Sequence, residues 1–249
     1  MNDRIKSTDD ALAEIAQYER GMPFFKMRVG DAVLRIAVPN HKCLYFATSY
    51  ETREAETNDW IRSFPDDAVF FDVGANIGIF SLLASVWTNA RIVAFEPHFA
   101  SYYAMVRTLL ENGLQQRVRA FPLALTDRSE FGSFFVADST AGKSLNQFGA
   151  PNPQYQATGD EFIELAAVST TLDRFVSESA IVPTHIKIDV DGLELAVLQG
   201  AHNTLAHPSM SAVMVELEGE EQPQIIDFMR DMGYARVNGG TPNAIFLRS

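Results

Sequence analysis

The chain has 249 residues, a length that suits one large domain or two small ones and allows a sizeable buried core. It is 47% hydrophobic and 21% charged, close to the average for soluble globular proteins, which argues against wholesale disorder. Its 32 Asp and Glu against 20 Lys and Arg give a net charge of −12 without a basic cluster, which disfavours a nucleic-acid partner because such a surface repels phosphate backbones.

Residues 1–65 predict an N-terminal extension of strands and a helix that packs on the main domain. The sequence has a weak helical spacing over 10–19, the alternation of strands over 26–38, and a helical pattern over 51–64 that Pro65 ends. The polar start lacks the apolar stretch of a signal peptide. The single cysteine, Cys43, cannot form an internal disulfide, which suits a reducing compartment. We therefore expect a cytoplasmic protein.

Residues 73–90 carry no charge and are long enough for a short membrane span. They contain two glycines and several polar residues, and they directly follow a strand-like run. We interpret this segment as a buried glycine turn followed by a helix, and we expect no membrane partner.

The remainder of the chain, residues 66–249, indicates one α/β domain. Continuous apolar runs, typical of strands buried on both faces, alternate with helical segments. The strands are expected over 68–73, 91–95, 118–125, 185–189 and 212–216. The helices are expected up to Trp87, over 101–112 and 193–205, and from near Pro223 onward.

An insertion at about 128–170 interrupts this alternation. Residues 131–137 and 161–168 look like strands, and the segment between them, 138–160, is rich in Gly, Pro, Asn, Gln and Ser. A loop of that length inside a compact domain is usually functional or mobile. Residues 170–173 then match a helix capping box.

The C-terminus predicts the topology of the sheet edge. Residues 234–238 and 244–247 are strand-like and are separated by only five residues. That gap is too short for a parallel crossover, which needs a dozen or more residues. We therefore expect a mostly parallel sheet that closes in an antiparallel hairpin.

Carboxylates follow or end five of the predicted strands. They are Asp72, Glu96, Asp127, Asp189 and Glu216. Ligands of open α/β sheets bind outside the carboxyl ends of the strands, so these residues predict a site there. Glu96 can accept hydrogen bonds from both hydroxyls of a ribose, and Asp127 can accept from an adenine amino group. Nicotinamide and S-adenosylmethionine (SAM) sites share the ribose-binding acid, so Glu96 indicates an adenosine ligand without naming the cofactor.

The turn Asp72–Gly78 is the second part of the predicted site. Gly74 allows a sharp turn after the strand, and Gly78 allows close approach to a ligand or to the sheet. The pattern is G-x-N-x-G, which lacks the third glycine of the dinucleotide motif. That difference and the terminal hairpin argue against an NAD-dependent oxidoreductase, which stays open as an alternative.

Several segments of the chain together resemble the FkbM family of SAM-dependent methyltransferases, in order and over roughly residues 68–217. They are VFFDVGANIGIFS (69–81), FEP (95–97), ALTD (124–127), TLD (171–173), IKIDVDGLE (186–194) and VLQGA (197–201). One departure is Asp191, where the family usually has Glu; the charge is kept and the reach is shorter.

The resemblance implies a Rossmann-like class I methyltransferase fold. It also implies O-methylation of a hydroxyl on a sugar or natural-product-type small molecule, with SAM as cofactor. By position, Asp72, Gly74 and Asn76 would line the methionine end of SAM, Glu96 would hold the ribose and Asp127 would lie by the adenine. Gly78 and Pro97 complete the predicted cofactor-binding set. A non-catalytic protein that binds an adenosine cofactor is a further alternative, because fold alone does not imply catalysis.

Asp189 and Glu216 are the predicted catalytic residues, because they end strands that should be neighbours in the sheet. Two carboxylates that converge would share a proton, bind a cation or pair with Lys187, which lies on the same face as Asp189. No metal-ligand spacing occurs among the histidines, and we favour a metal-free site with Asp189 as the general base. Residues 138–160 are expected to form a lid over the small-molecule acceptor. The acceptor's identity and the oligomeric state stay open.

Overall fold

The computed structural model describes residues 21–151, 161–217, 221–237 and 242–248, together with 8, 11–12 and 15–16. The expected helix over 10–19 and the second half of the expected loop over 138–160 therefore lie largely outside the described residues. None of the helices in the described part has the length and apolar character needed to cross a membrane.

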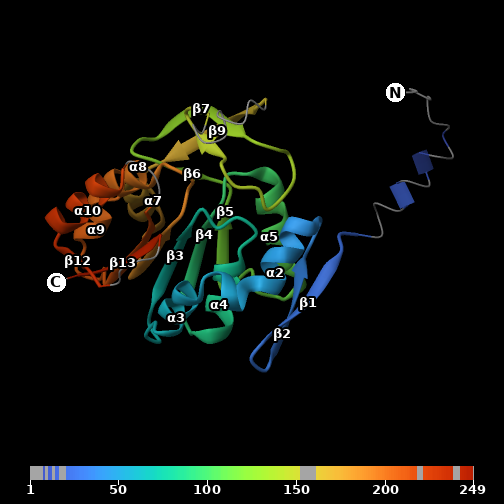
Figure 1. Ribbon diagram of the computed structural model, residues 1–249, viewed down its shortest axis with the longest axis horizontal. Helices are drawn as coiled ribbons and strands as arrows, with labels where there is room; N and C mark the ends of the chain where they lie inside the picture. The colour runs from blue at the N-terminus through green and yellow to red at the C-terminus, as the bar shows by residue number, and fades with distance from the viewer. Residues whose placement is uncertain are drawn as a thin grey trace.

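A seven-stranded sheet forms the centre of the described structure, with the order β12-β13-β11-β10-β3-β4-β5 (Figure 1). Its members are β3 (Val69–Val73), β4 (Arg91–Phe95), β5 (Val118–Phe121), β10 (His185–Ile188), β11 (Ala212–Glu216), β12 (Tyr234–Arg236) and β13 (Asn243–Arg248). The strands from β11 to β5 are all parallel, whereas β13 runs antiparallel to both β11 and β12. The sequence-based expectation of a parallel sheet with a closing antiparallel hairpin is confirmed.

Helices cover both faces of this sheet, which explains the continuous apolar strands. One face packs against α4 (Ile79–Trp87) and α5 (Phe99–Glu111), and residues such as Phe70 and Ile92 point into that core. The other face packs against α7 (Leu172–Ser179), α8 (Glu194–Gln199), α9 (His202–Ala206) and α10 (Gln222–Asp231). Phe71 and Val93, the next residues along the same strands, point into that second core.

The N-terminal extension consists of the hairpin β1 (Phe24–Val29) and β2 (Ala32–Ala37), followed by α2 (His41–Arg53) and α3 (Ala55–Arg62). The pattern over 26–38 predicted strands, and the observed pair turns at Gly30. The single helix expected over 51–64 is instead two helices, because Glu54 adopts φ −140° and ψ 63° between them. Side chains of this extension, Ile36 and Trp60 among them, belong to the same core as Phe70 of β3.

The insertion forms a second sheet with the order β6-β9-β7-β8. Its strands are β6 (Ala124–Leu125), β7 (Glu130–Val136), β8 (Gln147–Phe148) and β9 (Ile163–Thr170). The expected strand over 118–125 is therefore two strands in two different sheets. The break falls at Pro122, which has no backbone N–H to donate to a ladder. As a result the chain leaves the central sheet after Phe121 and enters the insertion sheet, which lies over the carboxyl ends of the central strands (Figure 1).

The capping box expected over 170–173 is shifted by one residue. Thr171 is the N-cap of α7, and its side chain accepts a hydrogen bond from the Arg174 N–H at 3.1 Å. The Asp173 carboxylate does not accept the hydrogen bond from the N-cap N–H of α7 that a capping box would require. Its carboxylate accepts hydrogen bonds from the backbone and side chains of Asn203 and Thr204, in the first turn of α9, at 2.7–3.0 Å.

Candidate functional site

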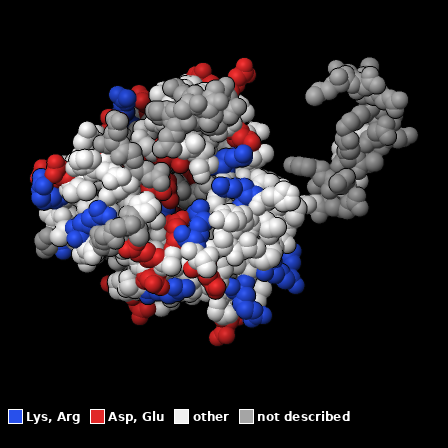
Figure 2. Space-filling view, in the orientation of Figure 1, with Lys and Arg blue, Asp and Glu red and all other residues white. Residues whose placement is uncertain are grey.

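A cavity of about 320 Å³ opens at the carboxyl ends of β3, β4, β10 and β11. The turns after these strands line it, together with α2, the start of α4 and part of the insertion. Figure 2 shows acidic and basic side chains gathered around the hollow in the middle of this face. Of the nine residues predicted for the site, Gly74, Asn76, Glu96, Pro97, Asp189 and Glu216 line this cavity.

The other three predicted residues, Asp72, Gly78 and Asp127, do not line the cavity. Asp72 is buried beneath it and accepts a hydrogen bond from Ser81 Oγ at 2.6 Å. Gly78 begins α4 with φ 79°, and a Cβ there would lie 2.7 Å from Met105 Cγ. Its small size therefore serves packing against α5. Asp127 is exposed and lies near Arg128, two residues beyond Leu125, which does line the cavity.

Gly74 brings the turn after β3 against the end of β10. Its φ of 78° favours glycine, and a Cβ at this position would lie 1.8 Å from the Asp189 carbonyl oxygen. No side chain can occupy that space without moving the backbone. Gly74 thus allows the turn after β3, which carries predicted cofactor-binding residues, to contact the end of β10, which carries the predicted catalytic residue Asp189.

Glu96 is buried at the end of β4 and faces the cavity. One carboxylate oxygen accepts from the Asn76 N–H and the other from the His98 N–H, both at 2.7 Å. Each oxygen keeps a second lone pair that can accept a hydroxyl. Burial raises the pKa of Glu96 to about 7, although the two backbone hydrogen bonds oppose the shift. The buried Asn76 Oδ1 has no hydrogen-bond partner within the described structure.

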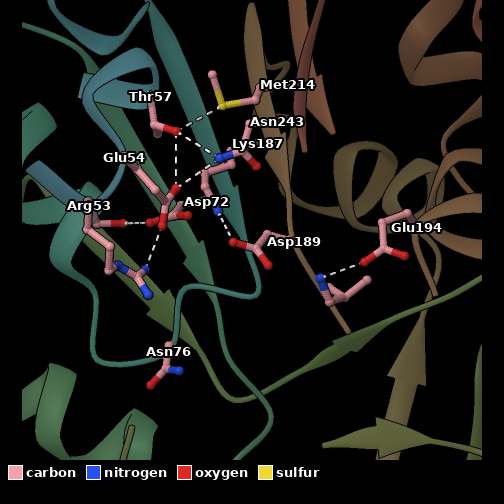
Figure 3. Close-up of polar contacts among 12 residues, drawn as sticks. Arg53, Glu54, Thr57, Asp72, Asn76, Lys187, Asp189, Glu194, Met214 and Asn243 are labelled. Atoms are coloured by element: carbon pink, nitrogen blue, oxygen red, sulfur yellow. Dashed lines mark hydrogen bonds and ion pairs between the residues drawn. The ribbon is translucent and has the colours of Figure 1, made fainter. Parts of the chain in front are cut away.

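Lys187, which is buried, and Asp189, which is half-buried, form an ion pair that lines the cavity (Figure 3). Lys187 Nζ lies 2.5 Å from Asp189 Oδ2, and Lys187 is 1% exposed. Burial alone would lower the pKa of Lys187, but the carboxylates of Asp189, Glu54 and Asp72 outweigh it and raise that pKa. Burial would likewise raise the pKa of Asp189, but the charge of Lys187 lowers it. Pairing with Lys187 is one of the three arrangements expected for these carboxylates, and the structure shows it for Asp189.

Asp189 also lies within hydrogen-bond contact of Glu216, which further lowers its pKa. Their strands, β10 and β11, are parallel neighbours as expected. Within the described residues, no cluster of three or more His, Cys, Asp or Glu has the arrangement of a metal site.

The sequence patterns missed the contribution of the N-terminal extension to the cavity. Tyr50 and Arg53 of α2 line it, and so does Glu54 in the break between α2 and α3. Arg53 Nη2 lies 2.5 Å from Glu54 Oε1, and Glu54 Oε2 accepts from Thr57 and Asn243 at 3.1 Å (Figure 3). No local motif marks these residues, because their place depends on how the extension packs.

The insertion also reaches the cavity. The lining residues are Lys143, Ser144, Leu145, Asn146 and Phe148, which lie in the first half of the segment expected to form a lid, 138–160, although the sequence singled out none of them. Asp191, noted in the sequence only as a departure from the FkbM motif, also lines the cavity. Burial raises its pKa to about 7, and the nearby charge of Asp189 adds to the shift.

Comparison with known proteins places these features in a family. The model of the methyltransferase FkbM domain matches residues 72–235. Hexuronic acid methyltransferase AglP of Haloferax volcanii is 29% identical over 162 residues, which are 64% of this chain and 59% of that protein. Methyltransferase sdnD of Sordaria araneosa is 26% identical over 199 residues, 70% of this chain and 76% of that protein.

The chain thus spans about three fifths of the length of AglP. Among solved structures, the methyltransferase FkbM from Methylobacillus flagellatus KT has a TM-score of 0.52 at 16% identity, over 83% of this chain and 52% of that one. That similarity shows a shared Rossmann-like fold. The family match favours a methyltransferase over the oxidoreductase that the sequence left open. The chain belongs to the FkbM family of methyltransferases.

Proposed function

We propose that the protein is a SAM-dependent O-methyltransferase that acts on a hydroxyl of a sugar or natural-product-type small molecule. The observation that carries the proposal is the buried carboxylate of Glu96 at the end of β4, which lines the cavity and accepts one backbone N–H on each oxygen. A ribose diol is the ligand that this arrangement suits. The hexuronic acid acted on by AglP, as its name states, supports a carbohydrate acceptor.

The residues of one half of the cavity fit the cofactor. Glu96 would hold the ribose, while the unpartnered Asn76 Oδ1 would accept from the amino group at the methionine end. Gly74 and Pro97 line the same half, and Asp72 supports it from below. The carboxyl groups of Glu96, Asp189 and Asp191 suit a cationic ligand. When bound, SAM supplies an electrophilic methyl group.

The other half of the cavity is the proposed acceptor site. The ionised Asp189, held by Lys187, would accept a hydrogen bond from the acceptor hydroxyl and orient its oxygen. Asp189 is also the proposed general base, and its contact with Glu216 gives the departing proton a second carboxylate to share. Tyr50, Arg53 and Glu54 would contact the rest of the acceptor.

Calorimetry with SAM and with NAD tests the cofactor assignment. Glu96→Ala should weaken SAM binding by about 1–3 kcal/mol, the range for hydrogen bonds to a charged group. Glu178→Ala, at an exposed carboxylate on α7, is the matched control and should bind SAM like the wild type. Unchanged SAM affinity in folded Glu96→Ala, or tighter binding of NAD than of SAM, would remove the assignment.

Transfer of a labelled methyl group from SAM to a panel of hexuronic acids and neutral sugars tests catalysis. Asp189→Asn should lose most of the transfer while still binding SAM, and a chelator should leave wild-type activity unchanged. Full activity of Asp189→Asn would exclude it as the base, and loss in chelator restored by magnesium would contradict the metal-free site. SAM binding without any transfer would favour a non-catalytic binding protein.

A further inference from the structure

Residues 141–148, which we name the strap, follow β7, include β8 and line the cavity. At one end the strap is fixed to the N-terminal half of the molecule. Asn40 Nδ2 donates to the Ala141 carbonyl at 2.8 Å, and the Gly142 N–H donates to Ser101 Oγ at 3.0 Å. A Cβ on Gly142 would lie only 3.2 Å from Cys43 Sγ, so this end also packs tightly against α2.

The middle of the strap is fixed to the turns that follow two central strands. Asn76, after β3, donates from Nδ2 to the Lys143 carbonyl at 3.4 Å. Asp191, after β10, accepts from the Leu145 N–H through Oδ2 at 2.7 Å. The Asp191 contact is the shorter of the two, and its acceptor is a carboxylate. It is therefore the stronger attachment of the middle of the strap.

The backbone at these contacts is strained. Four non-glycine residues in the described part of the chain have positive φ, and three of them are Asn76 at 52°, Asp191 at 58° and Leu145 at 65°. All three line the cavity, and the hydrogen bonds above join the first two to the strap. Strain of this kind persists where the surrounding structure over-determines it, and it is concentrated at ligand clamps and active sites.

The turn that carries Asp191 is held from its other side by Glu194 (Figure 3). The Glu194 carboxylate accepts from the Val190 N–H at 3.0 Å and from the Gly192 N–H at 3.1 Å. Because both neighbours of Asp191 are fixed in this way, its side chain is directed at the strap without a contribution from the strap itself. The acceptor for Leu145 is thus preorganised.

We propose that Asp191 is a positioning residue that holds the strap across the cavity and thereby retains the bound cofactor. The retention part rests on the proposed function, since it concerns SAM and its product. Asn76 connects the strap to the same turn whose N–H binds Glu96, so the strap borders the ribose-binding carboxylate. Release of the strap at Asp191 therefore opens the cofactor half of the cavity.

Two substitutions at Asp191 distinguish the effect of its side-chain hydrogen bond from the effect of its left-handed backbone conformation. Asp191→Gly removes the acceptor and suits the left-handed backbone, so the turn is not strained further. Asp191→Asn keeps an oxygen at the same reach and also tolerates this backbone. Ala180→Gly is the matched control, because Ala180 is the fourth residue with positive φ, at 55°, and it ends α7 away from the cavity.

Amide hydrogen exchange of the strap, measured without ligand, tests the anchoring. Exchange in Asp191→Gly should be at least about tenfold faster than in the wild type, because the carboxylate accepts backbone hydrogen bonds from Leu145 and Asn146 of the strap. Asp191→Asn keeps an acceptor oxygen but loses the charge, so its exchange should be accelerated less, and Ala180→Gly should remain close to the wild type. Unchanged exchange in Asp191→Gly, or equal acceleration in Asp191→Asn, overturns the proposal.

The dissociation rate of S-adenosylhomocysteine, measured by rapid-mixing displacement with excess SAM, tests retention. Asp191→Gly should release it about tenfold faster, and the rate for Asp191→Asn should lie between those of Asp191→Gly and the wild type. A wild-type rate in Asp191→Gly overturns the retention role. If the wild type binds no S-adenosylhomocysteine, the proposed function and retention both fail, whereas the exchange experiment still decides whether Asp191 anchors the strap.

Discussion

Glu96 and Asp191 are carboxyl groups that titrate close to neutral pH, because burial raises the pKa of each to about 7. Nearby carboxyl groups add to the shifts: Asp191 and Asp72 raise the pKa of Glu96, and Asp189 and Glu194 raise that of Asp191. A raised pKa means that the folded protein holds these protons more tightly than the unfolded chain does. Their contribution to the free energy of unfolding is therefore greatest at low pH and is lost as the pH rises through about 7.

Binding of SAM should have the opposite dependence on pH. On the proposed function, ribose hydroxyls would donate to the ionised form of Glu96, and a cationic ligand would favour ionised carboxylates, so SAM binding would lower both pKa values. We expect affinity for SAM to rise about tenfold between pH 6 and pH 8. Calorimetry in buffers of different ionisation enthalpy should detect proton release at pH 7.

The matched variant for this prediction is Glu96→Gln, which cannot titrate at this position. Its remaining affinity for SAM should change less with pH than that of the wild type. A wild-type affinity that is the same at pH 6 and pH 8 would contradict the link between these carboxyl groups and the cofactor.

At the scale of the elements, Asp173 joins two helices that are separate in sequence. It lies in the first turn of α7, and its carboxylate accepts four hydrogen bonds from Asn203 and Thr204 at the start of α9. It therefore performs for α9 the task of an N-cap residue. This explains why an acidic residue after Thr171 does not complete a capping box for its own helix.

Asp173→Ala should lower the free energy of unfolding by about 1–3 kcal/mol, because it leaves the first N–H groups of α9 without a partner. Urea unfolding measures the change. Glu178→Ala on the same helix removes only an exposed ion pair with Arg174 and should cost less than about 0.5 kcal/mol. Equal stability of the two variants would show that Asp173 does not connect the helices energetically.

At the scale of the whole molecule, the N-terminal extension and the methyltransferase domain share one core. Trp60 of α3 contacts Phe70 of β3 edge to face, with ring centroids 6.0 Å apart. Met27 and Ile36 of the hairpin are buried in the same cluster as Leu82 of α4. The boundary near residue 65 therefore separates two sequence patterns but not two hydrophobic cores. We expect the extension and the main domain to unfold as one unit.

The two tryptophans of the chain allow this expectation to be measured. Trp60 lies in the extension and Trp87 at the end of α4 in the main domain. Fluorescence of Trp87→Phe reports on the extension, and fluorescence of Trp60→Phe reports on the main domain. Each variant's fluorescence curve in urea should have the same midpoint as its own far-ultraviolet circular dichroism curve. An earlier fluorescence midpoint for the Trp87→Phe variant would instead identify the extension as a separate folding unit.

Local sequence was sufficient to predict the strands that are buried in the same way on both faces. The strands of the central sheet are apolar on both faces, so β3, β4, β10 and β11 were predicted to within a residue or two. The five residues between the two strands expected at the C-terminus, 234–238 and 244–247, required an antiparallel pair for reasons of length alone. The carboxylates at the ends of β4, β10 and β11 followed from the same reasoning, since parallel strands end at one edge of a sheet.

What only the tertiary structure decided was the course of the chain where distant segments meet. Helical periodicity continues over 193–205, yet α8 ends at Gly200, where a Cβ would lie 2.1 Å from the Thr126 carbonyl oxygen. In the same way, no local pattern brings Arg53 and Glu54 to the cavity or carries the strap to Asp191. Periodicity in the sequence indicates which face of a helix or strand is buried. These contacts depend instead on which other segment packs against that face, and this is determined only when the whole core packs.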